Sequence, residues 1–227
     1  MRNLPEPFPR LSEVGESALL VELADDISLS INAHVHDLDY WLGESIAKGV
    51  THWVPGYTSL LIHFDPLQTD HSTIRDWFHE RWQTCPSITD LKPAQIQIPV
   101  RYGGEDGPDL AAVAKTHRLS PSDVIRMHTA PVYRVGMMGF TPGFAYLMGL
   151  DPDLATPRLV NPRTHVPAGS VGIAGDQTGV YPIESPGGWQ LIGRTELVLF
   201  DPEQEPYFLL SPGDEVRFVI APGSAVQ

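Results

Sequence analysis

The sequence predicts an α+β protein of two domains, an N-terminal α/β domain followed by a C-terminal barrel-like β domain. Short β-type runs alternate with amphipathic helical patterns up to about residue 93. Beyond that point helical patterns are confined to two short segments, and prolines and glycines crowd residues 139–193. Because 227 residues suffice for two modest domains, this change predicts domains of residues 1–92 and 93–227.

The N-terminal region predicts the element order βαββαβ, which is the ferredoxin-like arrangement. Runs of alternating or continuous apolar residues predict strands at residues 18–23, 51–54, 57–64 and 95–100. Because only Pro55-Gly56 separates residues 51–54 from 57–64, these two runs are either two strands or one broken strand. Apolar side chains at helical spacing predict two helices, the second capped by Asp70; these side chains are Ile31, Val35, Leu38 and Leu42, then Ile74, Trp77, Phe78 and Trp82.

The C-terminal region predicts two short helices and then a closed, barrel-like set of strands. The helices cover residues 108–117 and 121–127, preceded by Gly107 and Ser120 as turn and capping residues. Short apolar runs between turns predict the strands, at residues 132–135, 171–174, 189–192, 196–200 and 216–220.

Composition excludes several classes of partner. Fifteen Lys and Arg against 28 Asp and Glu give a formal net charge of −13, which repels nucleic acid and anionic lipid. The single Cys85 cannot form an internal disulfide, and no Cys/His spacing suits a dedicated metal site. The first residues lack the apolar core of a signal peptide, and no apolar run is long enough to span a bilayer. We therefore expect a cytoplasmic protein with no nucleic-acid or membrane partner.

Three blocks in the C-terminal half are dense in glycine, proline, arginine and aromatic residues. They are GFTPGFAYL at residues 139–147, Pro157-Arg158 continued by NPRTHVPAGSVGIAG at residues 161–175, and YPIESPGGWQLIGRT at residues 181–195. They resemble the signature of the family that holds the B subunit of 5-oxoprolinase, the kinase inhibitor KipI and the proteins labelled allophanate hydrolase subunit 1. The resemblance continues in residues 15–19, 54–57, 98–104 and 107–110, so it covers nearly the whole chain.

This resemblance implies a cyclophilin-like β-barrel in the C-terminal domain and a role in an enzyme. The implied enzyme is an ATP-dependent 5-oxoprolinase, which hydrolyses the small-molecule substrate 5-oxo-L-proline to L-glutamate while ATP becomes ADP and phosphate. The chain would be its B subunit, active only in a hetero-oligomer with 5-oxoprolinase subunits A and C, and ATP would come with Mg²⁺. Two alternatives remain: a KipI-like inhibitor of a histidine kinase, and allophanate hydrolase subunit 1.

ATP-dependent ring opening needs cations and N–H donors, and the blocks offer both. All three lysines precede the blocks, so arginine must supply the cations there. The candidates for binding substrate or phosphate are Arg158, Arg163, Arg194, Gly169, Ser170, Gly187 and Gly188, with Gly172 and Gly175 as further turn glycines. The alternative is that these arginines fix loops and these glycines serve tight turns. No P-loop motif is present.

Candidates for a general base and for a pocket wall lie in the same blocks. His165, Asp176 and Glu184 can activate water, although each can equally be a structural hydrogen-bonding residue. The aromatic and proline residues predict a pocket wall or a subunit contact, with core packing as the alternative; they are Phe140, Pro142, Phe144, Tyr146 and Trp189. No G-x-S-x-G motif supports a serine-hydrolase triad.

Overall fold

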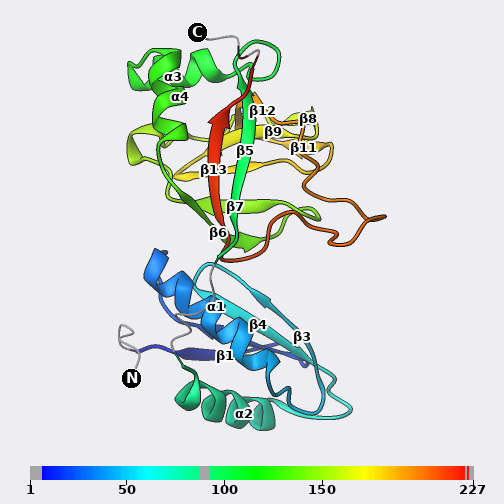
Figure 1. Cartoon of the computed structure of the whole chain (residues 1–227). Coiled ribbons are helices and arrows are strands. Elements are labelled where there is room, and N and C mark those ends of the chain that lie inside the picture. Colours follow the sequence, from blue (N-terminus) through cyan, green and yellow to red (C-terminus); the bar gives the residue numbers. More distant parts are fainter. Residues whose placement is uncertain (1–6, 87–92, 223, 225–227) are drawn as a thin grey trace. The chain divides into compact units, whose positions relative to one another are not determined.

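The computed structural model describes residues 7–86, 93–222 and 224 and has a mixed α/β fold (Figure 1). The chain divides into two compact units, Met1–Lys92 and Pro93–Gln227. None of the described helices is long and apolar enough to cross a membrane.

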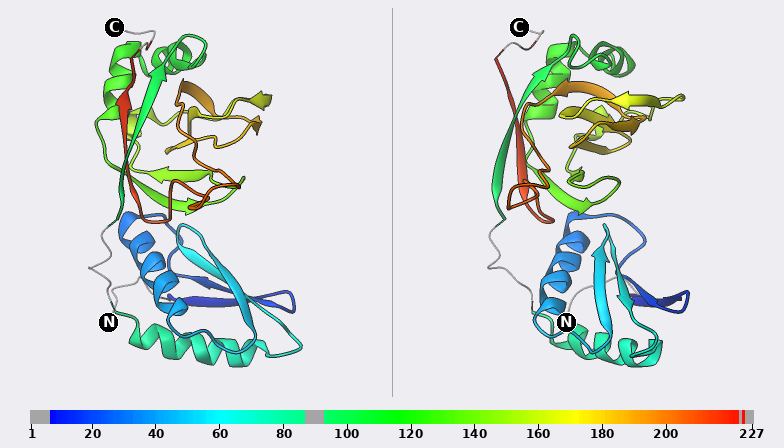
Figure 2. Two further views of the ribbon diagram at one scale, coloured as in Figure 1. Left: turned by 45° about the vertical axis from the view of Figure 1, so that its right-hand side comes forward. Right: turned by 90° about the vertical axis from the view of Figure 1, so that its right-hand side faces the viewer.

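The N-terminal unit is a four-stranded antiparallel sheet with two helices (Figures 1 and 2). Its elements are β1 (Arg10–Val14), β2 (Ala18–Glu22), α1 (Leu29–Gly43), β3 (Val50–Pro55), β4 (Ser59–Phe64) and α2 (His71–Thr84). The strand order is β1-β2-β4-β3. Both predicted helices are confirmed, and Asp70 caps α2 by accepting the Thr73 N–H at 2.8 Å.

The predicted order βαββαβ is wrong in its last strand. Residues 95–100 do not join the N-terminal sheet, because they belong to β5 (Gln95–Tyr102), which pairs with strands of the second unit. The sheet position next to β2 is taken instead by β1, a strand for which the apolar pattern gave no prediction. The described elements of this unit therefore follow the order ββαββα, which differs from the ferredoxin-like expectation.

Alternation in β2 and β4 explains why both helices share one core with the sheet. Alternate side chains of these strands are buried and meet the apolar stripes of α1 and α2. The main buried side chains are Leu19, Val21, Ile31, Val35, Leu38, Leu42, Leu60, Ile62, Phe64, Ile74 and Phe78.

In the C-terminal unit, seven strands of the described part close into a barrel in the order β10-β7-β6-β13-β5-β12-β9. The further strands of this barrel are β6 (Tyr133–Met138), β7 (Ala145–Met148), β9 (Ser170–Ala174), β10 (Gln177–Val180), β12 (Gln190–Arg194) and β13 (Glu215–Ile220). The β13–β5 pair is parallel and joins residues 120 positions apart. This closed barrel fits the cyclophilin-like domain that the resemblance implies.

Helices α3 (Leu110–His117) and α4 (Pro121–Thr129) pack at one end of the barrel (Figure 1). Both match the predicted segments, and α4 begins with a capping box in which Ser120 and Asp123 bond to each other's backbone. A short 3₁₀ turn, Pro152–Leu154, follows β7. Strands β8 (Arg163–Val166) and β11 (Ser185–Gly187) form a separate two-stranded ribbon.

Residues 199–209, between β12 and β13, form a projecting arm (Figure 1). The strand predicted at residues 196–200 is wrong, because only Phe200 forms a bridge there, with Phe208. Two backbone hydrogen bonds of 2.9 Å close the arm, from the Asp201 N–H to the Tyr207 carbonyl and from the Leu209 N–H to the Leu199 carbonyl.

His128 at the end of α4 is fully buried in the barrel core, where its hydrogen bonds define its proton position. The Thr178 hydroxyl donates to the Gly172 carbonyl at 2.9 Å, so Thr178 Oγ1 accepts from Nε2 of His128, also at 2.9 Å. Nδ1 therefore accepts from the Tyr102 hydroxyl at 2.8 Å. This network satisfies a neutral imidazole and leaves no acceptor for a second ring proton.

Burial lowers the pKa of His128 from 6.5 to about 3. In the unfolded chain this histidine takes up a proton below about pH 6.5. In the folded chain it stays neutral down to about pH 3. The free energy of unfolding should thus fall with decreasing pH in this window, by up to about 1.4 kcal/mol per pH unit from this group. Urea unfolding of the wild type and of His128→Gln at several pH values measures this dependence. The free energy of unfolding of the variant should change less steeply with pH than that of the wild type. Equal pH dependence in the two proteins would contradict a buried, neutral His128.

Candidate functional site

Five aromatic side chains pack together on the outer surface of the barrel, and we call them the aromatic face. Phe144 lies at its centre, with ring centroids 5.5 Å from Phe140, 4.8 Å from Tyr146, 5.3 Å from Tyr181 and 5.4 Å from Trp189. Four of these were predicted as a pocket wall, whereas Tyr181 was missed. Its place at the head of the third aromatic-rich block was the signal that could have found it.

Strand alternation places this face outside the barrel. In β7, Ala145 and Leu147 belong to the barrel core, so Tyr146 between them points outward. The ribbon then covers part of the face, since Val166 of β8 joins the same cluster. Gly187 of β11 makes this approach possible, because a methyl group there would lie 2.4 Å from the Tyr181 hydroxyl oxygen.

The carboxylate of Asp109 anchors the ribbon to the barrel. Its Oδ1 accepts from Nη2 of Arg163 in β8 at 2.7 Å, and its Oδ2 accepts from the Leu191 N–H of β12 at 2.7 Å. Arg163 also donates to the Trp189 carbonyl at 3.4 Å. Both side chains of the ion pair are largely buried. In this structure the head of Arg163 is therefore occupied by contacts within the protein.

Arg158 is placed differently, on a segment fixed from both sides. The carbonyl of Pro157 accepts from the Gln190 amide at 2.9 Å, and the Leu159 N–H donates to the Gly188 carbonyl at 2.7 Å. Arg158 itself is exposed, and among the described residues its guanidinium has no hydrogen bond or ion pair. A rigid segment thus presents a positive charge beside the aromatic face.

The charge of Arg158 acts on two hydroxyls of the aromatic face. Burial raises the pKa of both Tyr146 and Tyr181, and the nearby guanidinium lowers each in part. The net direction is upward, so both groups keep their protons at neutral pH. The backbone N–H of Trp189 also lowers the pKa of Tyr181 in part, but burial outweighs it. A protonated hydroxyl beside a guanidinium suits the binding of an anionic oxygen.

Of the base candidates, two are brought together and one stays apart. His165 of β8 and Glu184 just before β11 are exposed neighbours across the ribbon, with Nδ1 3.3 Å from Oε1. Strand pairing makes this contact between residues 19 positions apart, and no local pattern in the chain indicates it. Asp176 lies in the exposed two-residue turn between β9 and β10, with no ion pair within the described part of the chain.

The remaining predicted anion-binding residues mostly bond to the protein's own backbone. Nε of Arg194 donates to the Ala168 carbonyl at 2.9 Å, and the Gly169 N–H donates to the Tyr181 carbonyl at 2.7 Å. Ser170 is buried, and its N–H donates to the Pro167 carbonyl at 3.2 Å. Gly169 and Gly175 have the positive φ expected of turn glycines, whereas Gly172, Gly187 and Gly188 do not.

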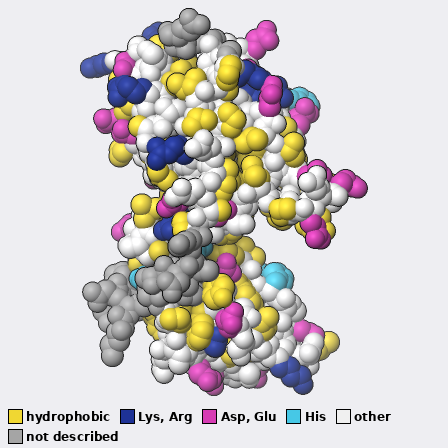
Figure 3. Space-filling model, viewed as in Figure 1, with side chains coloured by type: hydrophobic (Ala, Val, Ile, Leu, Met, Phe, Trp, Pro, Cys, Tyr) yellow, Lys and Arg dark blue, Asp and Glu magenta, His cyan; other side chains and the backbone are white. Residues whose placement is uncertain are grey.

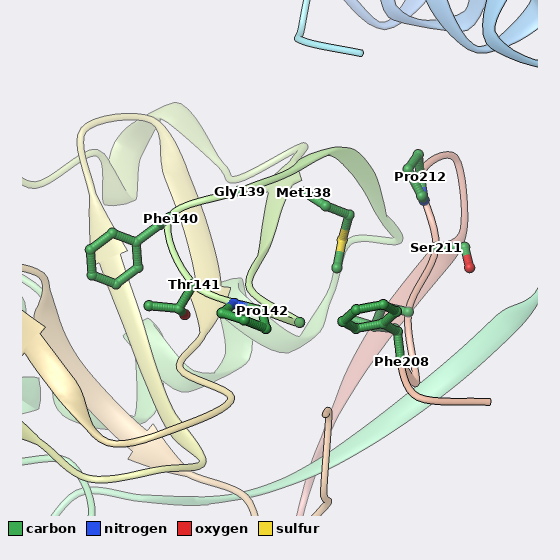
Figure 4. Close-up of a pocket in the computed structure, with 10 residues that line it drawn as sticks. Met138, Gly139, Phe140, Thr141, Pro142, Phe208, Ser211 and Pro212 are labelled. Carbon is green, nitrogen blue, oxygen red and sulfur yellow. The ribbon is translucent and has the colours of Figure 1, made fainter. Parts of the chain in front are cut away.

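The loop 139–143 separates the aromatic face from a cavity of about 530 Å³ (Figure 4). Phe140 has φ of +67°, an uncommon conformation for a non-glycine residue, and points away from Phe208. Met138, Pro142 and Phe208 point toward one another on the cavity side (Figure 4). The full lining is Met138, Gly139, Phe140, Thr141, Pro142, Gly143, Phe208, Leu210, Ser211 and Pro212.

Metal-ligating side chains do not gather anywhere in residues 7–86, 93–222 and 224: no group of three or more His, Cys, Asp or Glu is placed to hold an ion.

Removing Arg163 should destabilise the fold. Arg163→Ala leaves the largely buried Asp109 carboxylate without its cation, and we expect the free energy of unfolding to fall by about 1–3 kcal/mol. The matched control is Arg126→Ala, which removes the exposed ion pair with Asp123 on α4 and should cost less than about 1 kcal/mol. Urea unfolding of the isolated chain compares them; equal stabilities would exclude the anchoring role.

Comparison with known proteins connects this architecture to one family. The family model for the carboxyltransferase domain, subdomain C and D, matches residues 9–210. The chain is 40% identical over 220 residues to the B subunit of 5-oxoprolinase from Bacillus subtilis, covering 92% of each chain. It is 55% identical over 164 residues to the B subunit of 5-oxoprolinase from Haemophilus influenzae, covering 72% of this chain and 73% of that one.

A solved structure shares the fold as well. The crystal structure of TTHA0988 superposes with a TM-score of 0.80 at 37% identity, over 91% of this chain. The match spans only 40% of the TTHA0988 chain, so that relative extends well beyond the shared region. On the extent and identity of these matches, the chain belongs to the family of the 5-oxoprolinase B subunit.

Proposed function

We propose that the chain is the B subunit of an ATP-dependent 5-oxoprolinase, which hydrolyses 5-oxo-L-proline to L-glutamate. The relatives at 40% and 55% identity carry that name and support the assignment. The structural observation that carries it is the guanidinium of Arg158, held on a rigid segment beside the aromatic face with no ion pair among the described residues. An unpaired cation beside protonated hydroxyls suits an anionic small molecule.

The reaction explains why such a site is needed. Amide resonance makes the lactam carbonyl a poor electrophile, and ATP supplies the activation by phosphorylating the amide oxygen. Water then attacks the activated carbon, the ring C–N bond breaks and phosphate leaves. The protein must hold anionic oxygens in place and accept a proton from water.

We assign the anion-binding role to Arg158, with the Tyr146 hydroxyl as a neighbouring donor. Bidentate hydrogen bonding fits a guanidinium to a carboxylate or phosphoryl group. His165, oriented by Glu184, is our candidate for the base that activates water. Arg163 and Arg194 then act by positioning the ribbon and the turn at residues 167–170, because their contacts are internal.

The proposed enzyme also needs partner subunits, a compartment and a cofactor. The proposed partners are 5-oxoprolinase subunits A and C, and the cytoplasm is the proposed compartment. ATP with Mg²⁺ is the proposed cofactor, and the described residues offer neither a P-loop nor a metal cluster to hold it alone. Nucleotide binding is therefore assigned to a surface completed by a partner subunit.

Omission of the chain tests the assignment directly. The three subunits are expressed together, and ADP release is followed as a function of 5-oxoproline concentration, with and without this chain. Turnover should require the chain. If turnover is normal without it, but the chain lowers phosphate incorporation into a histidine kinase, the inhibitor alternative is correct. Ammonia release from allophanate instead would favour the allophanate hydrolase alternative.

Arg158→Ala tests the role of the site in the complete enzyme. Loss of a charge-assisted contact to substrate or transition state should lower kcat/KM by about 10- to 1000-fold. Arg158→Lys should recover part of the rate, and the thermal midpoint should stay unchanged because the side chain is exposed. An effect on KM alone indicates carboxylate binding, whereas an effect on kcat indicates contact with the phosphoryl group. Normal rates in Arg158→Ala, matching the control Arg126→Ala, would remove the assignment.

A further inference from the structure

We propose that the arm and the cavity beside it form the docking site for a partner subunit of the enzyme. The partner inserts an apolar side chain into the cavity and places basic side chains against the tip of the arm. This inference rests on the proposed function for the identity of the partner. The docking itself rests on the exposure, shape and charge of the surface.

The arm and its base expose more apolar surface than a folded domain needs to. Val198 is 66% exposed, and Tyr207 and Phe208 are each 44% exposed. Leu209 is exposed as well. Contiguous apolar patches rimmed by polar groups are typical of protein interfaces rather than of free surface.

The cavity offers a place for an anchoring side chain. Its walls come from two loops far apart in sequence, residues 138–143 and 208–212, and are mainly apolar (Figure 4). The Thr141 hydroxyl oxygen is buried there without a hydrogen-bond partner among the described residues. Apolar walls of this kind suit an aromatic or aliphatic anchor from a partner.

The arm is held in one conformation before any partner binds. The rings of Phe200 and Phe208 stack with centroids 5.2 Å apart, and two backbone hydrogen bonds close the arm. Gly143 fits the loop against its base, because a methyl group there would lie 2.7 Å from Cβ of Phe200. A pre-formed surface loses little conformational entropy on binding.

Negative charge at the tip of the arm determines which class of molecule can bind there. Asp201, Glu203 and Glu205 lie in the arm, and within the described part of the chain none has an ion pair with Lys or Arg. Figure 3 shows acidic side chains gathered on the projecting arm. Such a negative tip repels the carboxylate of 5-oxoproline and the phosphates of ATP. A polypeptide with an apolar anchor and flanking lysine or arginine is complementary to it. The occupant is therefore a protein surface and not the substrate.

Relatives carry this fold inside longer chains, which supports a polypeptide neighbour. The matched region makes up only 40% of TTHA0988. The rest of that longer chain is a polypeptide neighbour of the shared region, and in a multi-subunit enzyme a separate subunit would take its place.

The test measures partner binding and turnover separately. Wild type, the double variant Tyr207→Ser/Phe208→Ser and the tip variant Glu203→Lys are titrated with the other subunits, using analytical ultracentrifugation for affinity and ADP release for activity. We expect the double variant to weaken Kd by about 30-fold or more, as for loss of an interface hot spot. Glu203→Lys should weaken binding mainly at low salt. At saturating partner, the KM for 5-oxoproline should stay at its wild-type value.

Leu67→Ser is the control, since Leu67 is 94% exposed in the other unit and its variant should bind normally. Because Glu203 lies in the exposed part of the arm, its variant remains informative even if the double variant disturbs the arm. Unchanged Kd in both arm variants would overturn the docking site, as would a raised KM for 5-oxoproline with unchanged partner affinity. Absent turnover with normal partner binding and the expected arm effects would instead remove the proposed function and leave the docking site standing.

Discussion

The arrangement of the candidate site depends on the contacts of the Asp109 carboxylate. It occupies the N-cap position of α3 but makes no capping hydrogen bond, because its oxygens bind β8 through Arg163 and β12 through the Leu191 N–H. One group thus joins the start of a helix, a barrel strand and the covering ribbon. A carboxylate committed to two charge-assisted or backbone contacts is costly to leave unpaired when largely buried. The ribbon, and with it the cover over Tyr181 and Trp189, is fixed by this arrangement.

The same contact divides the arginines of the three aromatic-rich blocks into two groups. The guanidinium of Arg163 is already engaged with a largely buried carboxylate, so our proposal gives Arg163 a positioning role. Arg194 likewise serves a backbone carbonyl. The backbone around Arg158 is tied by two hydrogen bonds while its head group extends into solvent. A fixed backbone and a guanidinium without an internal partner together make a cation available to a substrate. Binding then costs little conformational entropy.

Patterns within a few residues predicted the helices and their caps well. They did not predict which strands and side chains pair over long distances in the sequence. Helices α2 and α4 follow from apolar spacing and from Asp70 and Ser120, whose caps involve residues three positions away. Strand β5 was placed in the wrong sheet, since its parallel partner β13 lies 120 residues further on. Asp109 looked like part of a helix start, and nothing near it in sequence indicates Arg163. The contact of His165 with Glu184 depends on ribbon pairing in the same way. The blocks therefore indicated candidate residues for the site, but not the partners that these residues contact.

Loop 139–143 connects the two proposed surfaces and offers a physical reason why the proposed enzyme would need more than one subunit. The ring of Phe140 packs on the aromatic face, 5.5 Å from Phe144, while Pro142 forms a wall of the cavity. Phe140 holds a positive φ, a strained conformation that persists only where its surroundings enforce it. Gly143 and Phe200 fix one end of this loop against the arm. A partner side chain in the cavity would therefore brace the loop that positions Phe140 over the substrate face. Under both proposals, subunit docking and substrate binding are coupled through a short loop whose two ends have little freedom to move independently.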